Sequence, residues 1–415
     1  MRSGRGTSLS QARMLSVAVA VALVLVWISP DARGATTTPR IDENQQGAPY
    51  AAGELLVSYD SGASRPRFDE VVKGAQARVE EEMADSDAQL LSFPTVQREQ
   101  RGYVREEKLQ RAKEALQKFP GVEHVDYNYV RLPDYSPNDS EFVAGKQRDL
   151  HSIKVPAAWN ETLGVGARVA VVDTGIDGDH SDLKSKIVAQ KDLVNNDDVA
   201  EDDIAGHGTN VVGTVGAVTN NGAGVAAVCP GCKLLVAKAG DSRVLYDSDI
   251  VQGIYWSVNN RAKAINLSLG SEGNSSILEH AVDYAWEHGV VVVAAAGNDN
   301  TGRPSYPAAY RHVISVAATD LSDRKAPFSN YGKIDVAAPG VEILSAVPGG
   351  RYDIRAGTSM ASPHVAALAG LLAAQDRSAP EIRRRIQSTA SDLGTEGKDK
   401  YFGWGLINAN KVVRS

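Results

Sequence analysis

Uninterrupted apolar runs alternate with helix-like segments over the C-terminal two thirds of this 415-residue chain. Such runs predict strands buried on both faces, because a strand with one face in water alternates apolar and polar residues. The predicted strands span residues 168–172, 233–237, 264–269, 290–295 and 313–318. Helices are predicted near residues 208–218, 248–262, 276–288, 359–375 and 379–390. The alternation predicts an α/β domain at residues 133–415, with a parallel sheet and helices on both of its faces.

A different pattern occupies residues 51–132. Strands are predicted at 54–59, 89–93 and 125–129, a charged helix at 68–83 and an amphipathic helix at 106–119. The order β-α-β-α-β, with room for one more strand, predicts a small α+β domain of the ferredoxin-like type. The polar stretch before it, residues 35–50, is predicted to be a linker.

Residues 1–34 have the composition of an export signal, with arginines at positions 2, 5 and 13 before an apolar run at 14–28. Small residues follow at 32–34, and the apolar run is short for a membrane span. An uncleaved membrane anchor is the alternative. The formal net charge of −7 argues against a nucleic-acid partner. We therefore expect a secreted, extracellular protein without stable membrane association.

Candidate chemistry begins with Ser359, in the run Gly-Thr-Ser-Met-Ala-Ser-Pro-His at residues 357–364. This serine opens an apolar helix, where the positive end of the helix dipole favours a developing anion. Pro363 comes early in that helix, where a missing N–H is expected to cost little. A lone serine at a helix start is more often a cap.

Three further motifs argue against a simple cap. Asp173 ends the apolar strand at 168–172, His207 stands between two glycines, and Asn298 follows the strand at 290–295. The chain order Asp, His, Ser is one of the known orders of a catalytic triad, and an asparagine amide can donate to an oxyanion.

These motifs resemble the subtilisin family of serine endopeptidases over about residues 133–412, and thermitase-like members most. The resemblance implies a secreted endopeptidase made as a zymogen, acting on proteins and peptides and expected to be a monomer. Residues 51–132 resemble the subtilisin propeptide, an intramolecular inhibitor and folding aid, on the run Pro120 to Val130. A non-catalytic binding protein with the same fold is the alternative.

The resemblance also implies a substrate site. Ser268, Leu269 and Gly270 are expected to form one wall, and Ala295, Ala296 and Gly297 the other, with Asp299 near the rim. Such small residues leave a wide slot, so we expect a large apolar side chain before the scissile bond. The sequence departs from the family at Arg243, Val244 and Leu245, where glycines are usual, and at Asn210, where histidine is usual.

Calcium is implied as well. The expected ligands are Asp139, Asp182, the Asn221 side chain and the carbonyl groups of Thr219, Ala223 and Val225, an oxygen set that suits Ca²⁺. A second site is considered at Asp192, Asn195, Asp197, Val199 and Glu201, although acidic loops are commonly just solvated.

The two cysteines, Cys229 and Cys232, stand in a Cys-Pro-Gly-Cys loop. In an exported protein we expect them to form a disulfide. A thioredoxin-type redox site would instead place this motif at the start of a helix, and a metal site would need further ligands.

Overall fold

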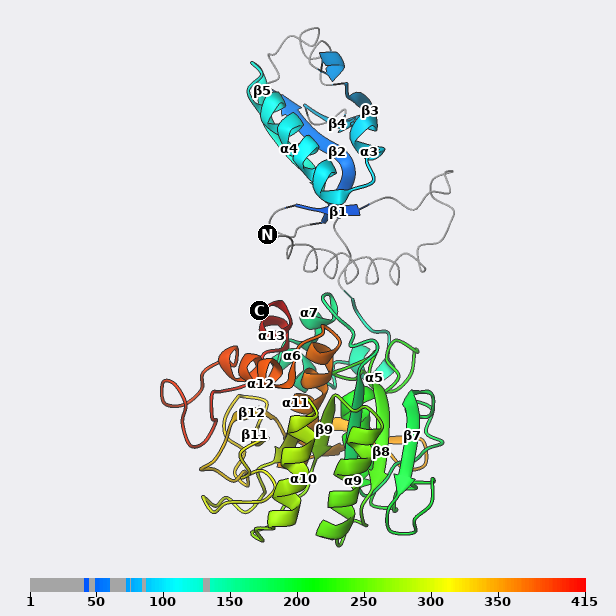
Figure 1. Cartoon of the computed structure of the whole chain (residues 1–415), viewed down its shortest axis with the longest axis vertical. Coiled ribbons are helices and arrows are strands. Elements are labelled where there is room, and N and C mark those ends of the chain that lie inside the picture. The colour runs from blue at the N-terminus through cyan, green and yellow to red at the C-terminus, as the bar shows by residue number, and fades with distance from the viewer. Residues whose placement is uncertain (1–40, 45–48, 60–71, 75, 84–86, 130–134) are drawn as a thin grey trace, which may run out of the picture. The chain divides into compact units, whose positions relative to one another are not determined.

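The computed structural model describes residues 41–44, 49–59, 72–74, 76–83, 87–129 and 135–415. These fall into two compact units, one ending at residue 129 and one beginning at residue 135 (Figure 1). The signal segment predicted at 1–34 and most of the linker predicted at 35–50 lie outside the described residues.

The N-terminal unit is an antiparallel sheet with helices. Its described elements are β1 (Ile41–Glu43), β2 (Pro49–Tyr59), β3 (Arg78–Met83), β4 (Ala88–Ser92), α3 (Pro94–Gln97), α4 (Gly102–Gln117) and β5 (Val122–Tyr129). β2 pairs with both β4 and β5, and β3 pairs with β4. Leu109 and Leu116 of α4 are buried against the sheet with Leu55 and Val125, as their helical spacing predicts.

Two predictions for this unit are wrong. Residues 41–43 and 49–50, inside the predicted linker, belong to the paired strands β1 and β2. Residues 78–83 form the edge strand β3 rather than the end of a helix. Five of its six side chains are exposed, so no apolar face marks the segment as a strand. The additional strand completes the ferredoxin-like order β5-β2-β4-β3.

The C-terminal unit contains a parallel sheet of seven described strands. They are β6 (Arg168–Asp173), β7 (Ile187–Asp192), β8 (Lys233–Lys238), β9 (Ala264–Leu267), β10 (Val291–Ala295), β11 (Val313–Thr319) and β12 (Val336–Pro339). Their spatial order is β12-β11-β10-β9-β6-β8-β7. The five predicted strands are confirmed, β7 and β12 are additional, and β13 (Ile343–Val347) pairs with β14 (Arg351–Arg355) as a separate hairpin.

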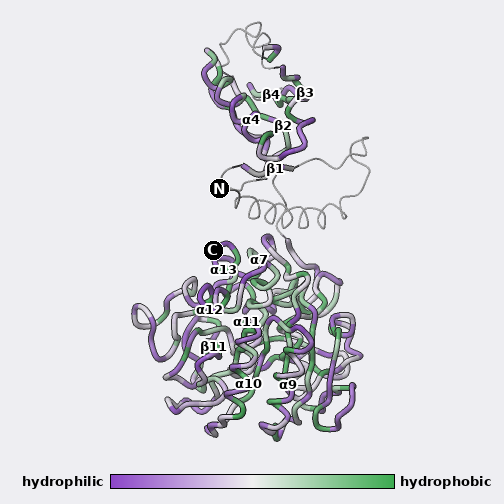
Figure 2. The backbone as a smooth tube through the Cα atoms, viewed as in Figure 1, coloured by the Kyte–Doolittle hydropathy of each residue, from purple (hydrophilic) through white to green (hydrophobic). Residues whose placement is uncertain are grey.

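Helices cover both faces of this sheet, as predicted. The described helices of this unit are α5 (Ser140–Val143), α6 (Arg148–Ser152), α7 (Val155–Trp159), η1 (Lys184–Lys186), α8 (His207–Gly216), α9 (Asp247–Asn259), α10 (Ser276–Glu287), α11 (Thr358–Ala373), α12 (Ala379–Ser388) and α13 (Ala409–Arg414). Successive β6 residues enter opposite cores: Val169 and Val171 pack with α8 and α11, whereas Ala170 and Val172 pack with α9 and α10. The hydrophilic stretches lie mainly in peripheral loops (Figure 2).

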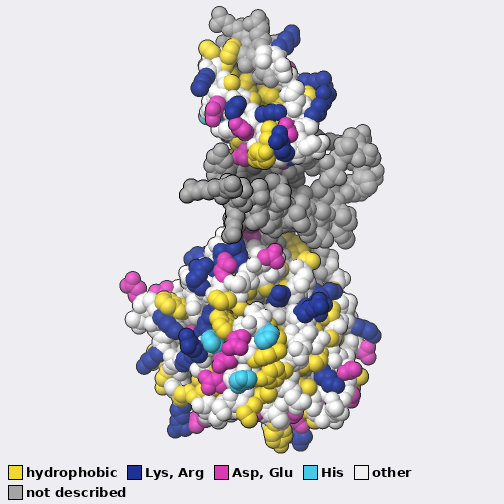
Figure 3. Space-filling model, in the orientation of Figure 1, with side chains coloured by type: hydrophobic (Ala, Val, Ile, Leu, Met, Phe, Trp, Pro, Cys, Tyr) yellow, Lys and Arg dark blue, Asp and Glu magenta, His cyan; other side chains and the backbone are white. Residues whose placement is uncertain are grey.

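Basic and acidic side chains are interspersed on the face of the molecule drawn in Figure 3. Within the described ranges, no helix combines the length and the apolar character that a membrane crossing requires.

Candidate functional site

Four sequence motifs meet near the carboxyl ends of the parallel strands. Asp173 is the last residue of β6, and Asn298 lies three residues after β10. His207 is the first residue of α8, and Ser359 is the second residue of α11. Side chains at this edge of an open α/β sheet converge on one crevice, which explains how residues far apart in sequence share a site.

Asp173 and His207 form a short hydrogen bond, with 2.6 Å between Asp173 Oδ1 and His207 Nδ1. Asp173 is buried, and its Oδ1 also accepts the backbone N–H of Thr174. A carboxylate can only accept, so the ring proton belongs on Nδ1 and Nε2 is left as the basic nitrogen. The Asp173 carboxylate holds the pKa of His207 above its usual range, although burial of the ring opposes this.

The backbone before His207 is held in an unusual conformation. Gly206 has φ +63°, and a Cβ there would lie 2.1 Å from Pro348 Cδ, so only glycine fits. The Arg355 guanidinium donates to the carbonyl oxygens of Ala205 and Gly206, at 3.2 Å for Gly206. The same positive charge lowers the pKa of His207.

A second carboxylate, Asp202, lies beside this pair. Its Oδ1 accepts the Thr174 hydroxyl, and its Oδ2 accepts both the hydroxyl and the backbone N–H of Thr209, all within 2.7 Å. The Thr174 hydroxyl in turn accepts the N–H of Gly208, next to His207. Burial raises the pKa of Asp202, and its negative charge adds to the rise in the pKa of His207.

Ser359 and Ser268 form two reciprocal hydrogen bonds. The Ser359 hydroxyl donates to the Ser268 carbonyl at 3.2 Å, and the Ser268 hydroxyl donates to the Ser359 carbonyl at 2.7 Å. The second bond is needed because Pro363, four residues on, has no N–H for that carbonyl. The missing N–H of Pro363 therefore has a structural consequence that the sequence reasoning did not anticipate. Catalytic hydrogen bonds to the base commonly form only when substrate is bound.

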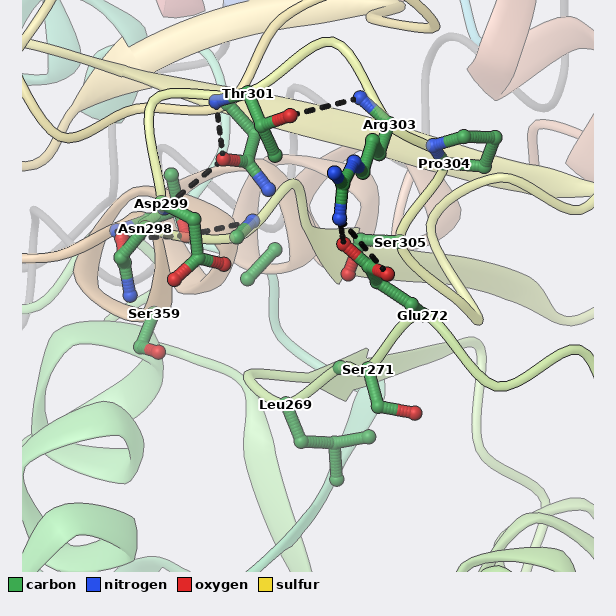
Figure 4. A pocket seen from close by; sticks show the side chains of 15 residues that line it. Leu269, Ser271, Glu272, Asn298, Asp299, Thr301, Arg303, Pro304, Ser305 and Ser359 are labelled. Carbon is green, nitrogen blue, oxygen red and sulfur yellow. Dashed lines mark hydrogen bonds and ion pairs between the residues drawn. The ribbon is translucent and has the colours of Figure 1, made fainter.

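The Asn298 amide is oriented by Thr358. Its Oδ1 accepts the Thr358 backbone N–H at 2.8 Å and the Thr358 hydroxyl at 3.0 Å. Because a backbone N–H must face an acceptor, the NH₂ group is turned the other way. In Figure 4 this group points toward Ser359 at one end of the pocket.

A cavity of about 220 Å³ opens beside Ser359 and Asn298. Five of the predicted substrate-contacting residues line it: Leu269, Gly270, Ala295, Gly297 and Asp299. Ser268 and Ala296 are buried and do not line it. Glu272 and Arg303 also line it, and the sequence analysis missed both because they stand in ordinary polar loops without a motif.

The first predicted calcium ligands converge. Asp139 and Asp182 are fully buried, and Asp182 accepts hydrogen bonds from Asn221 and Val225 of the 219–225 loop. Asp139 Oδ1 has no hydrogen-bond partner in the described part of the chain. Within the same part, the carbonyl oxygens of Thr219, Ala223 and Val225 accept no hydrogen bond. A buried carboxylate oxygen without a partner, together with the free carbonyl oxygens of a partly exposed loop, fits a hard cation.

In the second predicted calcium loop, the carboxylate oxygens of Asp192 and Asp197 accept hydrogen bonds from within the protein. Asp192 Oδ1 accepts the N–H groups of Val194 and Asn195, and Oδ2 accepts the Asn195 amide. Asp197 accepts the N–H of Val199, and the Glu201 carbonyl accepts Lys238. These hydrogen bonds engage both carboxylate oxygens of Asp192, and the second calcium site stays a prediction from the sequence.

The remaining predicted residues lie outside the cavity lining. Cys229 and Cys232 lie side by side in their loop, with 5.4 Å between their Cα atoms, immediately before β8. Asn210 is buried in α8 and donates to the Ala346 carbonyl at 3.4 Å. Arg243 is exposed and pairs with Asp241.

Known proteins resemble this chain in both of its units. A model of the subtilase family matches residues 164–405, and a model of the fervidolysin N-terminal prodomain matches residues 36–128. A thermophilic serine proteinase of Bacillus sp. (strain AK1) is 37% identical over 96% of this chain and 98% of its own length. Thermitase of Thermoactinomyces vulgaris is 44% identical over 68% of this chain and 100% of thermitase. A protease structure from Pseudoalteromonas arctica matches with a TM-score of 0.63 and 32% identity, covering 68% of this chain and 99% of that one.

Proposed function

Because the chain belongs to the subtilase family and is a serine protease, we propose that Asp173, His207 and Ser359 form its catalytic triad. The observation that carries the assignment is the 2.6 Å hydrogen bond between Asp173 and His207, at the strand ends where Ser359 also lies. The reaction is the hydrolysis of a peptide bond through an acyl-enzyme.

The first step is attack by the Ser359 hydroxyl oxygen on the scissile carbonyl carbon. His207 Nε2 takes the hydroxyl proton and later gives it to the leaving amine, while Asp173 stabilises the imidazolium. Water then attacks the acyl-enzyme with His207 again as base, which releases the acid product and restores Ser359. For this step the Ser359 hydroxyl turns from the Ser268 carbonyl to His207.

The oxyanion of each tetrahedral intermediate is held by two donors. These are the Asn298 NH₂ group and the Ser359 backbone N–H at the start of α11. The hydrogen bonds from Thr358 to Asn298 Oδ1 support this role, because they fix the amide orientation before substrate arrives.

The N-terminal unit acts as a removable inhibitor. The chain then divides into a signal peptide (1–34), a propeptide that ends at residue 132 and includes β1 within the 35–50 stretch, and a catalytic domain (133–415). The precursor cuts itself between about Val130 and Ser136, a stretch of which residues 130–134 lie outside the described residues. Binding of the C-terminal tail of the propeptide along the substrate edge strands, as a cleavage product binds, would explain inhibition without any further contact.

Substrates are proteins and peptides with a large apolar residue before the scissile bond. The apolar surfaces of Leu269 and Ala295 in the cavity support this preference. The loop at 241–246, with Arg243 in place of glycine, modifies preference further from the cleaved bond.

Calcium stabilises the catalytic domain at the first site. Asp139, Asp182, Asn221 and the carbonyl groups of Thr219, Ala223 and Val225 would hold it, and the unpaired oxygens described above support the assignment. The ion supplies charge neutralisation for two buried carboxylates and has no part in the acyl transfer. We do not extend the proposal to the 192–201 loop.

The mature enzyme is secreted as a monomer with a disulfide between Cys229 and Cys232. Export is supported by the apolar N-terminal run and by one relative, the minor extracellular protease Epr of Bacillus subtilis (strain 168), 38% identical over 70% of this chain. Mass spectrometry before and after reduction tests the disulfide.

The purified precursor tests the triad and the processing together. Wild-type protein should clear casein, lose activity with a serine-directed covalent inhibitor, and yield an N-terminus between residues 130 and 136. Ser359→Ala should clear no casein and keep residues 51–132 attached. Casein clearing by Ser359→Ala would exclude the triad, and inactivity of folded wild-type protein would favour the alternative of a non-catalytic binding protein. An active enzyme whose N-terminus lies before residue 51 would contradict the inhibitor role.

A further inference from the structure

Three charged side chains surround the mouth of the substrate cavity. Arg303 and Glu272 both line it and form an ion pair, with 3.2 Å from Arg303 Nη1 to Glu272 Oε1 (Figure 4). Both are well exposed, with side-chain exposures of 72% and 64%. Asp299 is the third charge, and it lines the cavity next to Asn298.

The cavity walls do not depend on this ion pair. The segments that carry Glu272 and Arg303 are joined by backbone hydrogen bonds between Ser271 and Tyr306, of 3.0 and 2.7 Å. Arg303 is further held by its N–H bond to the Thr301 hydroxyl. A substitution at Glu272 or Arg303 should therefore change the charge of the cavity mouth and leave its shape.

The third charge in the cavity lining is the carboxylate of Asp299. Its backbone N–H donates to the Asn330 side chain at 2.9 Å, which fixes its position. Its carboxylate makes no hydrogen bond or ion pair with any described residue. With Arg303 engaged by Glu272, the mouth of the cavity carries one uncompensated negative charge.

We propose that the Glu272–Arg303 ion pair sets the charge selectivity of this cavity, so that lysine is preferred over glutamate before the scissile bond. The inference rests on the proposed peptidase function and adds a second substrate class to large apolar residues. A lysine ammonium group meets the Asp299 carboxylate, whereas a glutamate can reach Arg303 only by displacing Glu272. Because an exposed ion pair is weak, the selectivity is moderate and open to change by single substitutions.

Three peptides that differ only in the residue before the cleaved bond, Phe, Lys or Glu, provide the test. The value of kcat/KM for Lys and Glu is divided by that for Phe in each enzyme, so that general losses cancel. Wild type should show a Lys/Glu ratio above one. R303Q should raise this ratio and E272Q should lower it, each about two- to fivefold, as expected for one exposed charge pair.

Matched controls separate a local effect from a change of net charge. R384Q on α12 and E287Q on α10 change the net charge equally, lie outside the cavity lining, and should leave all three rates unchanged. The exchanged pair, E272R combined with R303E, should return the ratio toward wild type. Raising the salt concentration should move the wild-type ratio toward one.

Two results would overturn the inference. A wild-type ratio at or below one would show that Asp299 is not the dominant charge, and ratios that stay within twofold in both R303Q and E272Q would show that the ion pair has no role. If wild type cleaves the Phe peptide in either case, the peptidase function stands and only the selectivity is wrong. Failure to cleave all three peptides would overturn both.

Discussion

Side chains around His207 act on its protonation in opposite directions. Asp173 and Asp202 raise the pKa of His207, whereas Arg355 and burial of the ring lower it. A general base works only in its neutral form, so a raised pKa moves the loss of activity on the acid side to higher pH. With His207 as the proposed base, the balance between these neighbours would set the pH at which activity falls on the acid side.

The first prediction concerns this balance. Asp202→Asn removes a negative charge and should lower the pKa of His207, so the acid limb of the kcat/KM profile moves to lower pH. Arg355→Gln removes a positive charge and should move the limb to higher pH. Profiles measured with one peptide substrate check both directions, with E287Q as control. Shifts in the same direction for both variants would contradict a charge effect and indicate a general loss of geometry.

The second prediction concerns the oxyanion. Asn298→Ala removes one of two donors and should lower turnover by about 10²–10³, a magnitude taken from subtilisin itself rather than derived for this chain. KM should change much less, because the donor acts on a charge that develops only in the transition state. Steady-state kinetics separate the two constants. A large rise in KM at unchanged kcat would instead make Asn298 a substrate-binding residue.

At this scale the sequence is informative only where a residue belongs to a motif. Asp173 ends an apolar run, and His207, Asn298 and Ser359 each stand within two residues of a glycine. The structure places all four near one edge of the sheet. Asp202 and Arg355 carry no such signal. Their influence depends on distances set by the tertiary structure, which no spacing in the chain encodes.

Among the elements, α11 depends on a neighbour outside its own hydrogen-bond ladder. Pro363 leaves the Ser359 carbonyl without a helical donor, and the Ser268 hydroxyl at the end of β9 supplies one. The contact ties the helix that carries Ser359 to the end of a strand of the central sheet. A buried carbonyl without a partner would cost about 1–3 kcal/mol.

A double-mutant cycle tests this element-level dependence. In an S359A background, which prevents self-digestion, Ser268→Ala should lower the free energy of unfolding by about 1–3 kcal/mol. Pro363→Ala restores a helical N–H to the same carbonyl, so the loss caused by Ser268→Ala should shrink when both are present. Chemical denaturation measures the four variants. Strict additivity would show that the proline and the serine hydroxyl do not serve the same carbonyl.

Element prediction succeeded where burial leaves a pattern and failed where it does not. The apolar runs of β6, β8, β9, β10 and β11 are buried on both faces and were recognised as strands. β3 is a charged edge strand, and its residues fit a solvated helix equally well. Only pairing with β4, a tertiary contact, decides its conformation.

For the whole molecule, calcium should matter for stability more than for chemistry. Excess chelator, given time for slow exchange, should lower the Tm of the S359A protein by several degrees, since binding at hundredfold excess over Kd contributes about 2.7 kcal/mol. Asp139→Asn should lower the Tm in calcium and reduce the further effect of chelator. Thermal unfolding with and without added calcium measures both. A Tm that chelator leaves unchanged in the parent protein would count against the site.

The strand order of the large sheet has a consequence for how the chain reaches its native state. β6 is the first of these strands to be synthesised, yet it is central, with Val169 opposite Ala264 of β9 and Leu234 of β8. The sheet cannot grow outward from a local hairpin, and parallel pairing between distant segments is slow to form. The antiparallel N-terminal unit has more local pairings and leaves the ribosome earlier. Residues 135–415 refolded alone should therefore regain native structure far more slowly than the S359A precursor. Stopped-flow fluorescence of the two proteins would measure how far the N-terminal unit sets the rate of folding.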